Sequence, residues 1–349
     1  MGYKEKISEY FLNKSGSYRF YKNEFHSNRQ DVIALKNEVN KLNNKVNKLN
    51  DKVKQLNEYS NSANFLINSI FLDNELKTKG IQLDMHRLCC ELFSFIDNIC
   101  KKYDLEWWIS GGNLIGAVRH EGFIPWDDDT DIAMMRSDYI KFHEVLFDEI
   151  KRNNLEDILN VSYRKRQIED KTIDSFIQIF IFHRREDGRI PIMAGIDIFP
   201  YDYIKSFDEE TLDDKYYEAK LNYFKNLSDG MDPMESLKLH YDELNLSFEK
   251  TDDIIPGVEG SYGPHNLLKL ITLKTDQIFP LKYVKYEDKM FPAPNVPQAY
   301  LEKVYGKYME VPKSVRTHSR VKNFRYEENA HELFEEHILR LKEVNENFK

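Results

Sequence analysis

The sequence predicts an α+β or mixed α/β catalytic domain that follows a coiled-coil helix. Valine and leucine repeat at alternating spacings of three and four within residues 30–60. From residue 65 onward, short apolar runs typical of strands alternate with longer stretches of helical periodicity. Of the 349 residues, 41% are hydrophobic and 31% are charged, which is enough apolar material for a packed core.

The heptad repeat has valine at every a position and leucine at every d position. Its members are Val32, Leu35, Val39, Leu42, Val46, Leu49, Val53 and Leu56. β-Branched residues at a with leucine at d favour a parallel two-stranded coiled coil, so we expect a homodimer. The alternative is a single amphipathic helix that folds back on the main domain.

The rest of the chain predicts the following elements. One or two helices are expected from Phe65 to about 101–102, and further helices at 114–120 and 137–150. Strands are expected at 105–110, 129–135, 175–183 and 195–201, and extended chain at Ile124–Trp126. Beyond Phe207 the chain is helical and charged, with loops at 256–264 and a proline-rich region at 279–312. The predicted division is a polar segment 1–29, a coiled coil 30–60, a catalytic domain 65–330 and a C-terminal helix 331–349.

Bulk properties exclude several classes of protein. A formal net charge of -9 argues against a protein that mainly binds nucleic acid. Cys89, Cys90 and Cys100 have no zinc-site or disulfide spacing, so we expect reduced thiols. No signal peptide and no apolar run of ~20 residues is found, which predicts a cytoplasmic protein without a transmembrane segment.

Four aspartates in five residues form the strongest candidate site. Side chains alternate along a strand, so Asp129 and Asp131 share a face about 7 Å apart, Asp127 joins them if the strand begins early, and Asp128 points the other way. Mg²⁺ and Mn²⁺ prefer such carboxylate oxygens. This crowding is costly unless a positive group neutralises it. A solvated loop or helix N-cap is the common alternative, but the apolar residues on both sides oppose it.

Gly111 and Gly112 separate the predicted strand 105–110 from a helix. Bare glycines let backbone amides approach phosphate, and a helix N-terminus adds positive charge. Asn113 is a candidate N-cap or phosphate donor. A diglycine alone is weak evidence, since most are simple turns.

The order strand, Gly-Gly, helix, loop and Asp-x-Asp resembles the nucleotidyltransferase (DNA polymerase β-like) superfamily. The string from Gly112 to Ile132, with Arg119-His120 and Ile124-Pro125-Trp126 before the aspartates, closely resembles the LicD family. That family is named for bacterial phosphorylcholine transferases and includes fukutin-type ribitol-phosphate transferases. The resemblance is dense over 106–142 and looser at 197–200 and at 300–312, where Tyr305-Gly306 lies.

The resemblance implies a nucleotidyltransferase-fold mixed sheet flanked by helices. It implies that Asp129 and Asp131 bind Mg²⁺ or Mn²⁺, that Asp197 supplies a third carboxylate from a neighbouring strand, and that Asp127 ligates the metal or acts through water. Asp197 or another acid would take the acceptor's proton. Arg119 and His120 would contact donor phosphate or the headgroup, with a C-terminal helix cap as the equal alternative.

The implied reaction transfers a phosphorylated headgroup, phosphocholine first, from a CDP-activated donor to a hydroxyl of a cell-surface glycan or its lipid-linked precursor. CDP-glycerol and CDP-ribitol are alternative donors. A choline headgroup would benefit from an aromatic cage, for which Trp107, Trp108 and Trp126 are candidates. The implied acceptor is compatible with a peripheral position at a membrane.

Several further residues have two interpretations. Tyr305 and Tyr308 either line the acceptor site or belong to the core. The basic clusters 164–166 and 183–185 either contact phosphate or an anionic glycan, or form solvated turns. A function of another class is a catalytically inactive, coiled-coil dimeric binding or scaffold protein. The intact acidic cluster and Gly111-Gly112 argue against that reading.

Overall fold

The computed structural model describes residues 2–14, 16–73, 77–260, 270–311, 320–324 and 327–348. The chain divides into two compact units, Met1–Asp73 and Asn74–Lys349. Parts of five predicted features lie outside the described residues: residues 1 and 15 of the polar segment, residues 74–76 of the helical stretch predicted from Phe65, loop residues 261–264, residue 312 of the proline-rich region and residue 349 of the C-terminal helix.

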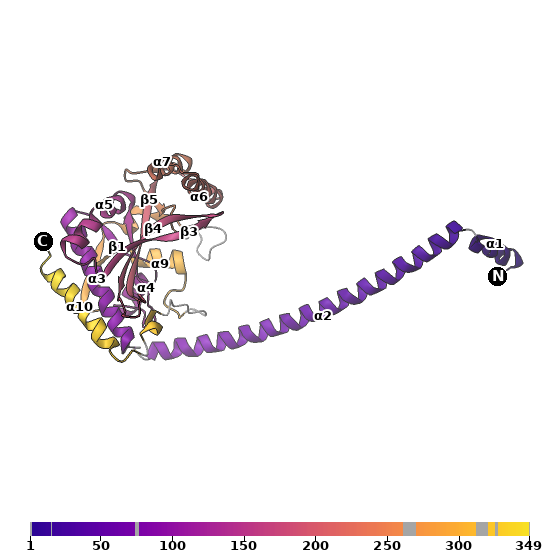
Figure 1. Cartoon of the computed structure of the whole chain (residues 1–349), viewed down its shortest axis with the longest axis horizontal. Coiled ribbons are helices and arrows are strands. Elements are labelled where there is room, and N and C mark those ends of the chain that lie inside the picture. Colours follow the sequence, from indigo (N-terminus) through magenta and orange to yellow (C-terminus); the bar gives the residue numbers. More distant parts are fainter. Residues whose placement is uncertain are drawn as a thin grey trace. The chain divides into compact units, whose positions relative to one another are not determined.

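The first unit is helical. It contains α1 (Tyr3–Lys14) and α2 (Gly16–Asp73), and α2 includes the whole predicted heptad repeat as one continuous helix (Figure 1). The eight valine and leucine side chains of the repeat are 51–67% exposed, although they are the most regular apolar series in the chain. The helix begins before residue 30 and ends after residue 60, so it is longer than the predicted coiled coil.

The second unit is built on a mixed sheet. Its strands are β1 (Trp107–Ile109), β2 (Asp131–Met135), β3 (Leu159–Ile168), β4 (Lys171–Phe182), β5 (Ile192–Ile204), β6 (Leu246–Ser247), β7 (Asp253–Pro256) and β8 (Leu273–Lys274). The main order is β1-β2-β5-β4-β3, and β6 and β7 pair with β5 while β8 pairs with β7. The β2–β5 pair is parallel and the other pairs are antiparallel. A separate hairpin joins β9 (Lys282–Tyr286) to β10 (Lys289–Ala293).

Helices flank this sheet. They are α3 (Ile81–Tyr103), α4 (Gly111–His120), α5 (Arg136–Arg152), α6 (Leu212–Ser228), α7 (Pro233–Leu244), α8 (Thr275–Ile278), α9 (Pro297–Tyr305) and α10 (Ala330–Glu346). The C-terminal helix α10 packs along α3 (Figure 1), and its Phe334, Ile338 and Leu341 belong to the same core as the sheet. The predicted α+β class, with a mixed sheet flanked by helices and preceded by an N-terminal helix, is confirmed.

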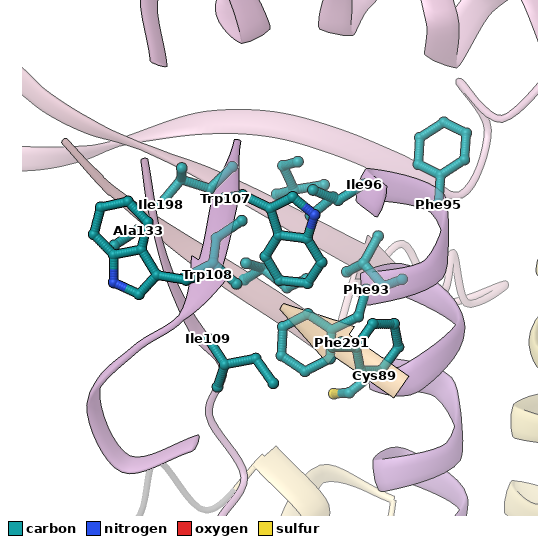
Figure 2. Close-up of a cluster of buried hydrophobic side chains, with 14 of the residues drawn as sticks. Cys89, Phe93, Phe95, Ile96, Trp107, Trp108, Ile109, Ala133, Ile198 and Phe291 are labelled. Carbon is teal, nitrogen blue, oxygen red and sulfur yellow. The ribbon is translucent and has the colours of Figure 1, made fainter. Parts of the chain in front are cut away.

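Strand β1 separates the two sides of the core. Trp107 points toward Phe93 of α3 and Phe291 of β10, while Trp108 points to the opposite side of the strand (Figure 2) and contacts the ring of Tyr201. Both tryptophans are buried, with exposures of 1% and 0%. A cage for a soluble headgroup needs accessible rings, so the expectation that Trp107 and Trp108 could form one is wrong. Trp126 is half-buried.

Helix α4 begins three residues earlier than predicted. Its N-cap is Ser110, in extended backbone, and Gly111 is the first helical residue, with a φ of 57°. Asn113 therefore lies inside the helix, and its prediction as the N-cap is wrong. A non-glycine residue would be strained at this φ, which explains why the strand can turn directly into a helix here.

Two other predictions differ from the structure before β2. Ile124–Trp126 is not extended, because the N–H of Asp127 donates to the carbonyl of Ile124 over 2.9 Å and closes a turn. Proline favours the second position of such a turn as much as it favours extended chain. The strand predicted at 129–135 begins only at Asp131. It is buried from Ile132 onward, as expected for a strand with a parallel neighbour.

A smaller core packs α6 and α7 against the far end of β5 and β7. It includes Ile204, Tyr216, Phe224, Tyr241 and Ile255. Within the described ranges, none of the helices combines the length and the apolar character needed to cross a lipid bilayer.

Candidate active site

The acidic segment is held by a buried amide on α4. Oδ1 of Asn113 accepts a hydrogen bond of 2.6 Å from the N–H of Asp131, and Nδ2 donates to the carbonyl of Asp129 over 3.3 Å. Nδ2 also donates to the hydroxyl of Tyr286 over 2.9 Å. Asn113 is 1% exposed and its amide is used entirely by these partners. It therefore positions the aspartates, and its role as a phosphate donor stays a prediction.

The sheet places Asp131 directly beside Asp197. The two residues are register partners in the parallel pair β2–β5, and the N–H of Asp197 donates to the carbonyl of Thr130 over 2.8 Å. Partners on adjacent strands are about 4.8 Å apart and share a face of the sheet. Asp197 therefore comes from the strand next to Asp131, as the resemblance implied.

The same row continues across two more strands. Asp197 pairs with Gln178 of β4, and Gln178 pairs with Ser162 of β3. Nε2 of Gln178 donates to Oδ1 of Asp197 over 2.8 Å. We call Asp131, Asp197, Gln178 and Ser162 the polar row. Its residues come from four strands, and three of them lie outside the acidic segment of the sequence.

The diglycine makes room for carboxylates. A Cβ on Gly111 would overlap Oδ2 of Asp131, and a Cβ on Gly112 would lie 3.1 Å from Oδ2 of Asp127. The acids therefore approach the backbone closely at both glycines, and binding of phosphate by Gly111 and Gly112 stays a prediction.

Crowding perturbs the acids strongly. Burial first, and then repulsion from Asp129 and Asp128, raises the pKa of Asp127 to about 7. Burial, followed by repulsion from Asp129 and Asp197, holds the pKa of Asp131 well above its ordinary range. Burial likewise raises the pKa of Asp197 to about 6, against the hydrogen bond from Gln178. The cluster favours any bound positive charge, whether a proton or a cation.

One positive charge is supplied by Arg320, in the 3₁₀ turn Arg320–Asn323. Its backbone N–H donates to Oδ2 of Asp128 over 2.6 Å, and its guanidinium donates to the carbonyl of Asp128 and lies 3.5 Å from Oδ1 of Asp129. Asp128 is 2% exposed and engages this turn. The sequence predicted that a neutralising group was needed, but it gave no signal that a residue 191 positions away from Asp129 would provide one.

His86 and Gln82 of α3 were also missed. Nε2 of His86 lies 2.7 Å from the carbonyl of Asp127, and the amide of Gln82 donates to the same carbonyl. The His86 ring stacks on Phe123 with centroids 4.1 Å apart. Burial lowers the pKa of His86 to about 4, so the ring is neutral at pH 7 and serves to hold the loop.

Arg119 and His120 contact each other and a segment after α9. Nε of Arg119 donates to Nε2 of His120 over 2.9 Å, and NH1 donates to the carbonyls of Tyr308 and Glu310 over 2.8 and 3.2 Å. These carbonyls lie outside α4, so Arg119 does not cap its own helix. Contact of this pair with donor phosphate stays a prediction, as does a role for Tyr305 and Tyr308 in acceptor binding.

The two basic clusters have different surroundings in the structure. Arg185 pairs with Glu327, donates to the carbonyl of Asn323 over 2.9 Å and lies over the ring of Phe324, so it is used within the fold. Arg164 of the other cluster is exposed and lies on β3, two residues beyond the polar row.

The acids have the chemistry of a divalent-metal site without its arrangement. Hard divalent cations prefer carboxylate oxygens, and the mutual repulsion described above would be relieved by such an ion. Within the described ranges, however, no three His, Cys, Asp or Glu side chains are arranged so that they could hold a metal ion together. The assignment of Asp127, Asp129, Asp131 and Asp197 as metal ligands therefore stays a prediction.

Known proteins match the part of the chain that holds this site. Residues 104–244 match the family model "LicD/FKTN/FKRP, nucleotidyltransferase domain". Over 62 residues the chain is 44% identical to the lipopolysaccharide cholinephosphotransferase LicD of Haemophilus influenzae, which covers 18% of this chain and 23% of that protein. Over 157 residues it is 32% identical to an uncharacterized protein of Rickettsia typhi, covering 44% and 45%. Over 55 residues it is 33% identical to human ribitol 5-phosphate transferase FKRP, covering 14% and 11%.

The chain thus spans less than half of the length of each of these relatives. The matched region nevertheless contains β1, the diglycine, the four aspartates of the loop, and Asp197 with its neighbours in the polar row. Residues 104–244 are thus similar to the nucleotidyltransferase domain of the LicD family.

Proposed function

We propose that the protein is a metal-dependent phosphotransferase. It moves a phosphorylated headgroup from a CDP-activated donor to a hydroxyl of a cell-surface glycan or its lipid-linked precursor, in the cytoplasm. The observation that carries this proposal is the pairing of Asp131 with Asp197, which gathers carboxylates from two strands beside Asp129. Two relatives are named as transferases of phosphocholine and of ribitol 5-phosphate.

Asp127, Asp129, Asp131 and Asp197 would hold Mg²⁺ or Mn²⁺, and the ion would neutralise the donor diphosphate and the leaving CMP. The acceptor hydroxyl forms a new O–P bond as the P–O bond to CMP breaks. Asp197 is suited to accept the hydroxyl proton because Gln178 fixes its Oδ1 and so orients the second oxygen. Asn113, His86 and Arg320 hold the loop that carries the other acids.

Phosphocholine is the favoured headgroup, because a relative that is 44% identical over 62 residues is named as a cholinephosphotransferase. Burial of Trp107 and Trp108 removes two of the three cage candidates, so phosphoglycerol and phosphoribitol remain the alternative headgroups on the same machinery.

The direct test incubates the purified protein with CDP-choline, CDP-glycerol or CDP-ribitol, with Mg²⁺ or Mn²⁺, and with water or a glycan acceptor. We expect CMP release from one donor and a metal-dependent thermal shift. Absence of both with every donor would contradict the enzyme and favour the inactive scaffold.

We also propose that the protein is a homodimer through α2. The heptad positions on α2 are 51–67% exposed in the single chain, and burying leucine or valine contributes about 1.5–3 kcal/mol per side chain. A second copy of the same helix offers the matching surface, since valine at a and leucine at d form a parallel pair.

A further inference from the structure

We infer that Arg164, with Arg166 beside it, forms a diphosphate-binding end of the active-site face and binds the diphosphate of the nucleotide donor. This inference rests on the proposed function and assigns residues that lie outside the acidic loop. Both arginines belong to β3, the strand that also carries Ser162 of the polar row.

The register of the sheet places Arg164 on the same face as the acids. Ser162 pairs with Gln178, which pairs with Asp197, so these three side chains point the same way. Arg164 and Arg166 follow Ser162 at steps of two on β3 and so share that face. The register shifts between Tyr163 and Lys165, where β4 contributes two residues opposite Arg164.

The guanidinium of Arg164 is close enough to act on Asp197. Its positive charge lowers the pKa of Asp197, against the larger effect of burial. Burial first, and then the charge of Arg164, lowers the pKa of Arg166, so the two arginines lie near each other as well as on one face. The two positive charges repel each other, and an anion bound between the two side chains would relieve this repulsion.

Neither arginine has a carboxylate partner among the described residues. Arg164 is exposed and makes no ion pair there. Arg166 is half-buried, lies over the Phe224 ring at 4.6 Å and donates to the carbonyl of Gly260 over 3.3 Å, while its buried Nε–H has no partner within that part of the chain. The charge of Glu259 acts on Arg166, but Arg136 already holds that carboxylate with two hydrogen bonds.

Lys165, between the two arginines, provides the contrast. It points to the other face of β3 and pairs with Asp174, and both side chains are exposed. The lysine is therefore neutralised on the surface, whereas the arginines are left positive on the active-site face.

A diphosphate ester fits this distribution of charge. One end of the ligand would lie at the aspartates, where a divalent cation is expected, and the other at the two guanidinium groups. Arginine binds phosphate oxygens with two parallel hydrogen bonds. A sugar hydroxyl carries no charge and would not need these residues. The diphosphate of a lipid-linked acceptor shares the donor's chemistry, so the test must separate the two.

The experiment measures binding of inorganic pyrophosphate, CDP and cytidine by calorimetry, with Mn²⁺ present. The variants are Arg164→Gln and, as the matched control, Lys165→Gln. We expect Arg164→Gln to weaken pyrophosphate and CDP by about 10- to 100-fold, the loss typical of a hydrogen bond to a charged group, and to leave cytidine binding unchanged. Lys165→Gln should bind all three like the parent protein. Circular dichroism verifies that both variants fold.

Each other outcome has a defined meaning. Equal pyrophosphate binding in the parent and in Arg164→Gln overturns the inference. Unchanged CDP binding with a raised KM for the glycan acceptor also overturns it, because the arginines would then serve the acceptor. Pyrophosphate binding that depends on Arg164, in a protein that releases CMP from no CDP donor, supports the inference while the proposed function fails.

Discussion

Helix α2 and the active-site face use apolar and charged residues in opposite ways. In α2 the apolar residues form one regular stripe that remains 51–67% exposed in the single chain. In the second unit Ile132 and Ile198 are fully buried, and the residues left beside them are carboxylates that repel each other. Among the described residues, the stripe on α2 is therefore left without apolar cover, whereas the acids are left with only part of the positive charge that would neutralise them.

The two regions need different kinds of binding partner. The missing partner of α2 has the same chemistry as the helix itself, so a second copy satisfies it. The missing partner of the aspartates must be positive, and Arg320 supplies only part of that charge. We therefore expect changes at the site to alter catalysis without altering the oligomeric state, and changes in the stripe to do the reverse.

The largest effect is expected from Asp131→Asn. It keeps the shape of the side chain but removes the charge at the centre of the cluster, so CMP release should fall on the order of 10³-fold. The melting temperature should not fall, because the charged form is disfavoured there by burial and by its neighbours. The exposed turn variant Asp170→Asn is the control. Near-normal turnover in Asp131→Asn would show that the metal assignment is wrong.

The second largest effect is expected from Gly111→Ala. CMP release should fall roughly 10²-fold, because the new side chain displaces Asp131 from its position. The new methyl group meets Oδ2 of Asp131, and the positive φ adds about 1 kcal/mol of strain. Gly188→Ala is the matched control, since Gly188 also has a positive φ but has open space around it. If both variants lose activity equally in the CMP assay, the approach of Asp131 is not the cause.

A smaller loss, about tenfold, is expected for Arg320→Met in the same assay. The backbone bond to Asp128 remains, whereas the guanidinium contacts with the acidic segment disappear. Extra Mn²⁺ should restore part of the activity, because the cation replaces the lost charge. A rise in activity at every metal concentration would mean that Arg320 opposes metal binding.

The smallest effect on turnover, within about twofold, is expected for Val39→Lys combined with Val46→Lys. Charges at two a positions should separate the helices, so light scattering should report half the parent mass. The control, Asn40→Lys with Asn47→Lys, adds the same charge at outward positions and should remain dimeric. An unchanged mass in the valine variant would refute the coiled coil.

The sequence can show which neighbouring residues lie close together. Gly111, Asp129 and Asp131 are near one another in the sequence, and a family motif pointed to Asp197, which β5 brings beside Asp131. The metal- and phosphate-binding roles of these residues stay predictions. Arg320 and His86 were missed because they reach the loop from distant segments, and no local pattern marks such contacts. The strand β3 was missed because Arg164 and its neighbours read as a solvated basic turn, although alternate side chains face the site.

The burial of all three native thiols has a practical consequence. Cys89, Cys90 and Cys100 lie in the core, burial raises the pKa of Cys89 to about 12, and it holds the pKa values of the other two well above their ordinary range. Alkylating and oxidising reagents attack thiolates, so the three native cysteines should not react with them in the folded chain. In the variant Leu35→Cys, the introduced thiol would therefore account for any reaction that is observed. It should form a disulfide with its counterpart in a parallel pair, and it should remain a free thiol in an antiparallel one.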